Sequence, residues 1–172
     1  KRLIEIPSKY RRARQWHSRG NFVEAFLEDI SGNSLGAERL YLKGAKHGLS
    51  ADAHFVAAAK IAHKRGDIDR RDKLIGLAIR ASGIKSLALI KKAQWLLEAG
   101  EFEKAEAVIS DVSGSSRELS SVLRLRGEIY FQKKDFSQLI TLLPKLTSRK
   151  VFDRTRLENL QISAYSGYLL NS

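Results

Sequence analysis

The sequence predicts an all-α protein, built as a right-handed solenoid of antiparallel helix pairs. Its composition favours helix over strand, because alanine, leucine, lysine, arginine and glutamate are frequent and only two prolines and 12 glycines interrupt them. Apolar residues recur at the helical spacing, and no segment alternates as a strand would. A period of 34 residues also places turn residues at Gly32, Gly66, Gly100 and Lys134.

Other positions keep the same period. Eight residues into each unit stands a residue small enough for two helices to approach closely: Ala25, Ala59, Ala93 and Gly127. A second set predicts a repeated buried site: Tyr41, Ile75, Ile109 and Leu143. A third set predicts apolar plugs where the second helix of a pair starts: Ile68, Phe102 and Phe136. Because several independent positions share one period, chance is a poor explanation for it.

The expected helices follow in chain order. The first begins after Pro7 and Ser8, and the sequence leaves open whether it runs unbroken to about residue 30. Apolar faces predict further helices near residues 51–65, 85–99, 101–112 and 154–170. Three turns are followed by a carboxylate that could cap the next helix: Asp67, Glu101 and Asp135. Pro144 predicts a bend or an early end of its helix.

The period divides the chain into six segments. Residues 1–20 form a basic N-terminal helix or juxtamembrane segment, which the first repeat, at residues 18–51, overlaps. Three repeats follow at residues 52–85, 86–119 and 120–153, and residues 154–172 form the first helix of a further, truncated repeat. This last helix carries apolar residues in place of the polar face that normally closes a solenoid, so we expect the native chain to continue or to dimerise there.

The positive charge is concentrated at the N-terminus. The formal net charge is +12, and in the first 20 residues seven basic side chains face a single acid, Glu5. Three interpretations stay open: a solvated helix, a segment held near anionic lipid, or an arm that binds nucleic acid. For the lipid interpretation the candidate residues are Arg11, Arg12, Arg14, Trp16 and Arg19. Trp16 would then be an interfacial anchor, although packing on the first repeat explains it equally well.

The sequence predicts no catalytic residue and no metal site. It contains no cysteine, which excludes disulfides, thiol nucleophiles and thiolate zinc sites. His54 and His63 are nine residues apart and therefore fall on opposite faces of one helix, where they cannot form a helical metal pair. No serine, histidine and acid are arranged as a triad-like motif. We expect no cofactor, with haem bound through His63 or a tyrosine as the alternative.

The first helices of the repeats should line a concave groove. In the repeat register this groove presents Phe22, Phe26, Lys60, His63, Lys64, Gln94, Leu97, Arg124, Glu128, Phe131 and Gln132. The apolar members could anchor the face of a bound peptide, and the cations could hold its carboxylates. The competing expectation for each apolar member is packing against a neighbouring helix.

These units resemble the tetratricopeptide repeat, best at Ala93, Leu96, Gly100, Phe102 and Ala105. Three stretches narrow the resemblance to the HemY-type family: AERLYLKGAKHG (37–48), RGDIDRRDKLIGLA (65–78) and LITLLPKL (139–146). The likeness covers about residues 8–170. It implies two membrane helices before residue 1, further repeats after residue 172, and a repeat domain on the cytoplasmic side of the bacterial inner membrane.

The HemY-type resemblance also implies an association with late haem synthesis, but it brings no catalytic residues. The protein expected from this sequence is a membrane-tethered scaffold that binds other proteins, haem-biosynthesis enzymes among them, in its groove. Two alternatives remain: a module that binds or delivers haem or porphyrin, and a basic helical domain that binds nucleic acid.

Overall fold

The computed structural model describes residues 8–47, 50–82 and 85–171, and for residues 8–16 and 171 it describes the backbone alone. The described residues form helices and no strand, which confirms the all-α class. The helices are α1 (Ser8–Ile30), α2 (Ser34–Ala45), α3 (Ala51–Lys64), α4 (Ile68–Ala81), α5 (Ser86–Glu98), α6 (Phe102–Ser110), the short 3₁₀ helix η1 (Gly114–Glu118), α7 (Ser120–Lys133), α8 (Phe136–Ser148) and α9 (Arg154–Asn171). The first helix runs unbroken to Ile30, which answers the question that the sequence left open.

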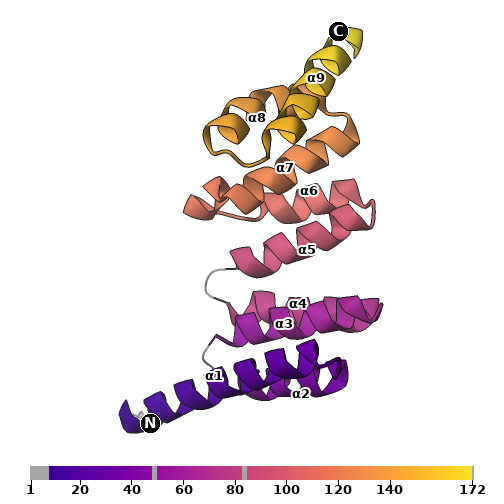
Figure 1. The fold of residues 1–172 in the computed structure, drawn as a ribbon. Coiled ribbons are helices and arrows are strands. Elements are labelled where there is room, and N and C mark those ends of the chain that lie inside the picture. The colour runs from indigo at the N-terminus through magenta and orange to yellow at the C-terminus, as the bar shows by residue number, and fades with distance from the viewer. Residues whose placement is uncertain (1–7, 48–49, 83–84, 172) are drawn as a thin grey trace. The chain divides into compact units, whose positions relative to one another are not determined.

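The chain divides into two compact units, unit 1 (residues 1–88) and unit 2 (residues 89–172). In unit 1 each helix packs against the next, from α1 to α4 (Figure 1). In unit 2, α6 packs on α7, α7 on α8, and α8 on α9, while α7 also contacts α9. The boundaries of the 34-residue repeats stay a prediction.

The four predicted turn residues all adopt the left-handed backbone conformation. Their φ angles are 88° at Gly32, 75° at Gly66 and Gly100, and 57° at Lys134. At each turn the N–H of the following residue donates to the carbonyl five residues earlier, for example from Asp67 to Ala62 at 3.0 Å. The turn residue itself donates to the carbonyl three residues earlier. This is the Schellman arrangement, which ends the first helix of each pair and satisfies its last carbonyls.

Because Lys134 holds a left-handed conformation that glycine adopts freely, we expect Lys134→Gly to stabilise unit 2 by about 1 kcal/mol. A suitable control is Lys92→Gly, which lies inside α5 and should cost about 1 kcal/mol of helix stability. Urea unfolding of the two variants measures both effects. If Lys134→Gly lowers the stability, residue 134 does not occupy the same left-handed turn position as Gly32, Gly66 and Gly100.

The residues after the turns cap the following helices, with one exception. The Asp67 carboxylate accepts from the Arg70 N–H at 3.1 Å, and Asp135 accepts from the Gln138 N–H at 3.1 Å. The expectation for Glu101 was wrong: its side chain makes no capping bond to α6 and pairs with Lys104 instead. The longer glutamate side chain extends past the backbone N–H groups that an aspartate reaches.

The periodic small and apolar positions are buried as predicted. Ala25, Ala59 and Ala93 are fully buried, and a Cβ at Gly127 would lie 3.1 Å from the Leu146 side chain. The second set, Tyr41, Ile75, Ile109 and Leu143, is at most 4% exposed. The set that starts the second helices is less uniform. Phe102 and Phe136 are half-buried, whereas Ile68 is 46% exposed and does not act as a plug.

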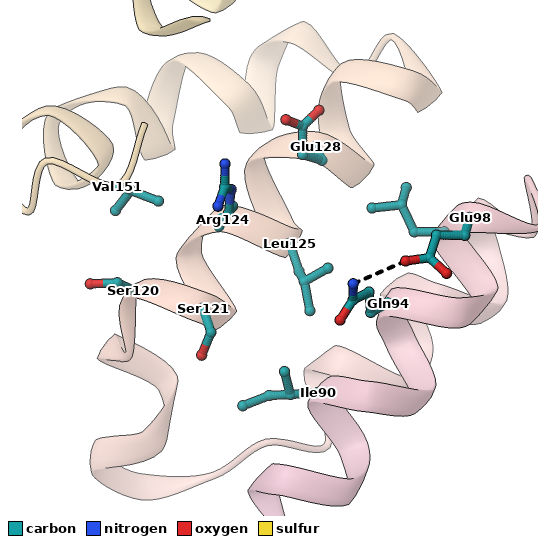
Figure 2. A pocket seen from close by; sticks show the side chains of 10 residues that line it. Ile90, Gln94, Glu98, Ser120, Ser121, Arg124, Leu125, Glu128 and Val151 are labelled. Carbon is teal, nitrogen blue, oxygen red and sulfur yellow. Dashed lines mark hydrogen bonds between the residues drawn. The ribbon is translucent and has the colours of Figure 1, made fainter. Parts of the chain in front are cut away.

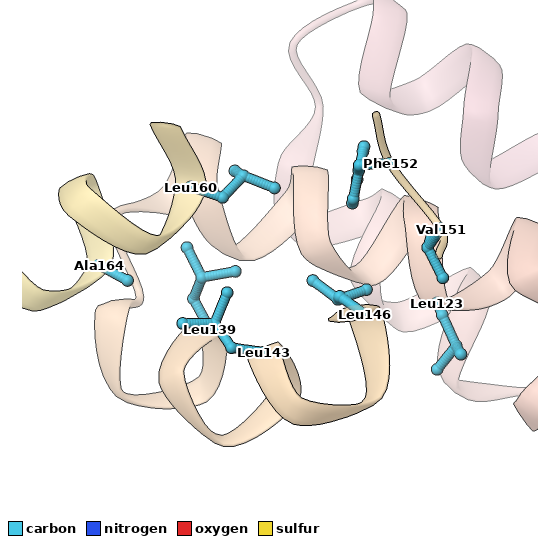
Figure 3. Packing of buried hydrophobic residues seen from close by; sticks show 8 residues of the cluster. All are labelled: Leu123, Leu139, Leu143, Leu146, Val151, Phe152, Leu160 and Ala164. Atoms are coloured by element: carbon cyan, nitrogen blue, oxygen red, sulfur yellow. The ribbon is translucent and has the colours of Figure 1, made fainter. Parts of the chain in front are cut away.

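Unit 2 has a core where α7, α8 and α9 meet (Figure 3). The residues that build it are Leu123, Leu139, Leu143, Leu146, Val151, Phe152, Leu160 and Ala164. Pro144 is exposed, so its ring stays clear of this core, and α8 continues to Ser148 without the early end that was one expectation for it. The outer side of α9 keeps large apolar residues exposed, including Ile162 at 66%.

Candidate functional site

An open pocket of about 540 Å³ lies in unit 2 between α5 and α7 (Figure 2). Its lining residues are Ile90, Gln94, Leu97 and Glu98 of α5, Ser120, Ser121, Arg124, Leu125 and Glu128 of α7, and Val151. Both helices are first helices of a predicted pair. The pocket is therefore built from the face that the repeat register assigned to the groove.

The polar groups of the pocket are already partly connected. Gln94 donates from Nε2 to the Glu98 carboxylate at 2.9 Å (Figure 2). Gln94 also accepts from Lys91 at 2.6 Å. Glu128 forms a two-pronged ion pair with Arg156 of α9, with the Arg156 Nε 3.2 Å from its Oε1. These contacts hold the carboxylates in place at one end of the pocket.

Arg124 is the pocket's cation. It is exposed, and its guanidinium carbon lies 5.4 Å from the centre of the Phe152 ring, at a distance typical of a cation–π contact. Among the side chains that the structure describes, Arg124 forms no ion pair with an acid. Its charge is therefore available to an acidic group on a bound molecule, beside the apolar surface of Ile90, Leu97 and Leu125.

The structure brings four of the predicted groove residues into this pocket: Gln94, Leu97, Arg124 and Glu128. Phe131 packs against the unit 2 core, with the Arg156 guanidinium 4.9 Å from its ring centre, and Gln132 is exposed on α7 outside the pocket lining.

The remaining predicted groove residues lie in unit 1 and are not among the residues that line this pocket. Phe26 is 53% exposed on α1, and Phe22 lies at the edge of a ring cluster, 5.0 Å from Tyr41. Lys60 is exposed, His63 is half-buried, and Lys64 forms an ion pair with Asp29 at 2.7 Å.

Of the predicted lipid-facing residues, only Arg19 has a described side chain, and it is exposed. The side chains of Arg11, Arg12, Arg14 and Trp16 lie outside the described part of the chain, although their backbone is helical. In the described residues no helix is both long and apolar enough to cross a bilayer. Within the same residues no cluster of three or more histidine or acidic side chains could hold a metal ion.

Unit 1 contains a buried histidine that the sequence did not indicate. His54 of α3 is 2% exposed, and its Nε2 lies 2.8 Å from the Ser18 hydroxyl of α1. Phe22 and Tyr41 pack edge-on against its ring. Burial lowers the pKa of His54, and the nearby His47 lowers it further. This cluster joins α1, α2 and α3, and its deep burial makes it a packing element.

Two of the three stretches that carry the HemY-type resemblance, residues 37–48 and 65–78, meet in unit 1. Glu38, from the first stretch, is buried and pairs with Arg65 at 2.7 Å and with Arg70 at 2.8 Å, both from the second stretch. Arg71 is also buried and hydrogen-bonds Asp72 at 2.7 Å. The Glu38–Arg70 pair therefore joins α2 to α4, which is a structural role.

Comparison with known proteins agrees with this resemblance. The chain is 24% identical over 166 residues to Protein HemY of Escherichia coli strain K12, an alignment that covers 89% of this chain. The same identity and coverage are found with Protein HemY of Shigella flexneri. The chain is thus similar to the HemY proteins over most of its own length. It spans 42% of the length of these curated relatives.

The relationship to HemY rests on sequence alone. No protein-family model matches the chain, and no solved structure matches it significantly.

Proposed function

We propose that this chain is the part of a HemY-type scaffold that binds an extended segment of a partner protein in the pocket between α5 and α7. The observation that carries the proposal is the composition of the pocket. The pocket is lined by residues that lie one predicted repeat apart, namely Gln94 with Glu128 and Ile90 with Arg124. Such a stack of helix pairs in the tetratricopeptide manner leaves a continuous inner face for a peptide.

The chemistry of the pocket defines the segment that fits it. Ile90, Leu97, Leu125 and Val151 offer an apolar surface for one or two aliphatic or aromatic side chains of the partner. Arg124 offers its guanidinium to a carboxylate beside them, and Ser120 and Ser121 offer hydroxyls to the partner's backbone. The ligand we propose is therefore an apolar peptide segment with an acidic residue next to its anchor.

The cellular setting is part of the same proposal. The relationship to HemY supports an association with haem biosynthesis, and haem-biosynthesis enzymes are the partners we propose. The concentration of basic residues in positions 1–20 supports attachment at the inner face of a bacterial membrane.

Site-specific photo-crosslinking tests the pocket. A photoreactive residue replaces Ser121, which is exposed and lines the pocket, in the full-length protein in bacterial cells. The control replaces Ser137, which is exposed on α8 and does not line it. We expect a discrete protein adduct from position 121 and none from position 137. Equal adducts from both positions, or none from position 121, would exclude the pocket as the partner site.

A further inference from the structure

The outer face of α1 carries large apolar side chains that no other described element covers. Val23, Phe26, Leu27 and Ile30 are 59%, 53%, 59% and 68% exposed. Their spacing of three, one and three residues places them in one stripe along the helix. We call these four residues the α1 stripe.

The packed face of the same helix is small and polar. Its buried residues are Ser18, Asn21 and Ala25, which are 4%, 7% and 0% exposed. In α1 the larger hydrophobic side chains are thus on the solvent side, the reverse of an ordinary surface helix. Packing within unit 1 gives no reason for this arrangement, and an exposed apolar stripe of this kind marks an interaction surface.

The C-terminal half of α1 carries three acidic residues, and two of them form an ion pair or a hydrogen bond within the protein. Asp29 pairs with Lys64 at 2.7 Å, and Glu28 accepts a hydrogen bond from Asn33 at 2.6 Å. Glu24 is exposed one position after Val23 and falls beside the stripe, about 100° around the helix. The stripe itself therefore contains no acid.

The same helical positions become basic toward the N-terminus. Arg19 is exposed and precedes Val23 by four residues, which places both on one helix face. In the sequence, Trp16, Arg12 and Lys9 continue this spacing. Residues 1–20 as a whole hold seven basic side chains and one acid. The sequence spacing thus predicts that basic and aromatic residues continue the apolar stripe toward the N-terminus.

We propose that this face of α1 lies in the headgroup region of an anionic lipid bilayer. The α1 stripe would be inserted between the headgroups, and Arg19 with the basic residues before it would contact lipid phosphates. The positive charge at the N-terminal end of α1 favours an anionic bilayer as the binding partner of this face. An exposed apolar stripe beside a strongly basic segment is the combination that interfacial helices use, and it complements an anionic surface. The inference rests on the membrane attachment proposed above and assigns it to one face of α1, and it does not depend on the pocket of unit 2.

Vesicle co-sedimentation of the 172-residue chain tests the inference. The vesicles contain either phosphatidylcholine alone or phosphatidylcholine with 30 mol% phosphatidylglycerol. The test variant is Phe26→Ser/Leu27→Ser. The matched control is Ile162→Ser/Leu170→Ser, which removes exposed apolar residues from α9. All four residues are exposed, so both variants should keep the wild-type helical circular dichroism.

We expect the wild type to sediment with the anionic vesicles and not with the neutral ones. The α1 variant should bind at least tenfold more weakly, while the α9 control should bind like the wild type. Arg19→Glu should also weaken binding, and 0.5 M salt should weaken it further. The inference is wrong if the α1 variant binds like the wild type, if both double variants lose binding equally, or if the wild type binds no anionic vesicles. Salt-sensitive binding to a DNA or RNA strand without vesicle binding would assign the basic segment to nucleic acid.

Discussion

Gly44→Ala should destabilise unit 1 by about 2 kcal/mol. A Cβ at this position would lie 2.2 Å from Cε1 and 2.6 Å from Nδ1 of His54. The His54 ring cannot move aside cheaply, because it is held by the Ser18 hydroxyl and packed by Phe22 and Tyr41. Overpacking of this kind costs up to about 3 kcal/mol, and the better helix propensity of alanine returns about 1 kcal/mol of it.

Gly76→Ala is the matched control for Gly44→Ala. It makes the same substitution inside α4, where the nearest atom to a new Cβ is a terminal nitrogen of Arg80 at 3.6 Å. It should stabilise unit 1 by up to about 1 kcal/mol. Urea unfolding followed by circular dichroism compares the two. If both variants shift the unfolding midpoint in the same direction, the close approach of α2 to His54 is incorrect.

The second large effect is expected in unit 2. Leu139→Ala should cost about 3 kcal/mol, because Leu139 is 0% exposed at the centre of the α7–α9 core and its removal leaves a cavity. Leu142, on the same helix, is only partly buried, so Leu142→Ala should cost clearly less.

Thermal unfolding of the two leucine variants provides the comparison. In a Trp16→Phe background, which removes the other tryptophan of the sequence, the fluorescence of Trp95 supplies a probe within unit 2, because Trp95 is 5% exposed in α5. Equal losses of stability in the two variants would mean that α8 presents a different face to the core.

The periodic parts of the fold could be predicted because each position repeats one physical requirement. A helix that ends in a Schellman turn needs a left-handed residue, and glycine at 32, 66 and 100 supplies it. Where two helices cross closely, only a small residue fits, so Ala25, Ala59 and Ala93 are fully buried. These requirements are local or fixed by the period, and they can be seen in a single sequence.

The features that sequence analysis missed depend on contacts between distant residues. Ser18 and His54 are 36 positions apart, and Glu38 and Arg70 are 32 apart. Nothing in the local sequence of either partner indicates the other. The neighbours of His54 along the chain do not show that α1 and α2 enclose it.

The candidate site could be predicted only in part, because some of its residues come from a distant part of the chain. The helical register gave one face of α5 and one face of α7, which supply Gln94, Leu97, Arg124 and Glu128. It did not give Val151, because that residue reaches the pocket from the segment between α8 and α9. The groove residues predicted in unit 1 were grouped with the others by register, and they are not among the residues that line this pocket.

The central claim is that the pocket between α5 and α7 binds an acidic, apolar segment of a partner protein. Its most direct test is the yield of the crosslinked adduct from position 121 in full-length protein that also carries Arg124→Glu. Arg149→Glu serves as the control, because it reverses the same charge at an exposed residue outside the pocket. We expect Arg124→Glu to lower the yield at least tenfold and Arg149→Glu to leave it unchanged. An unchanged yield with Arg124→Glu, or an equal loss with both variants, would contradict the claim.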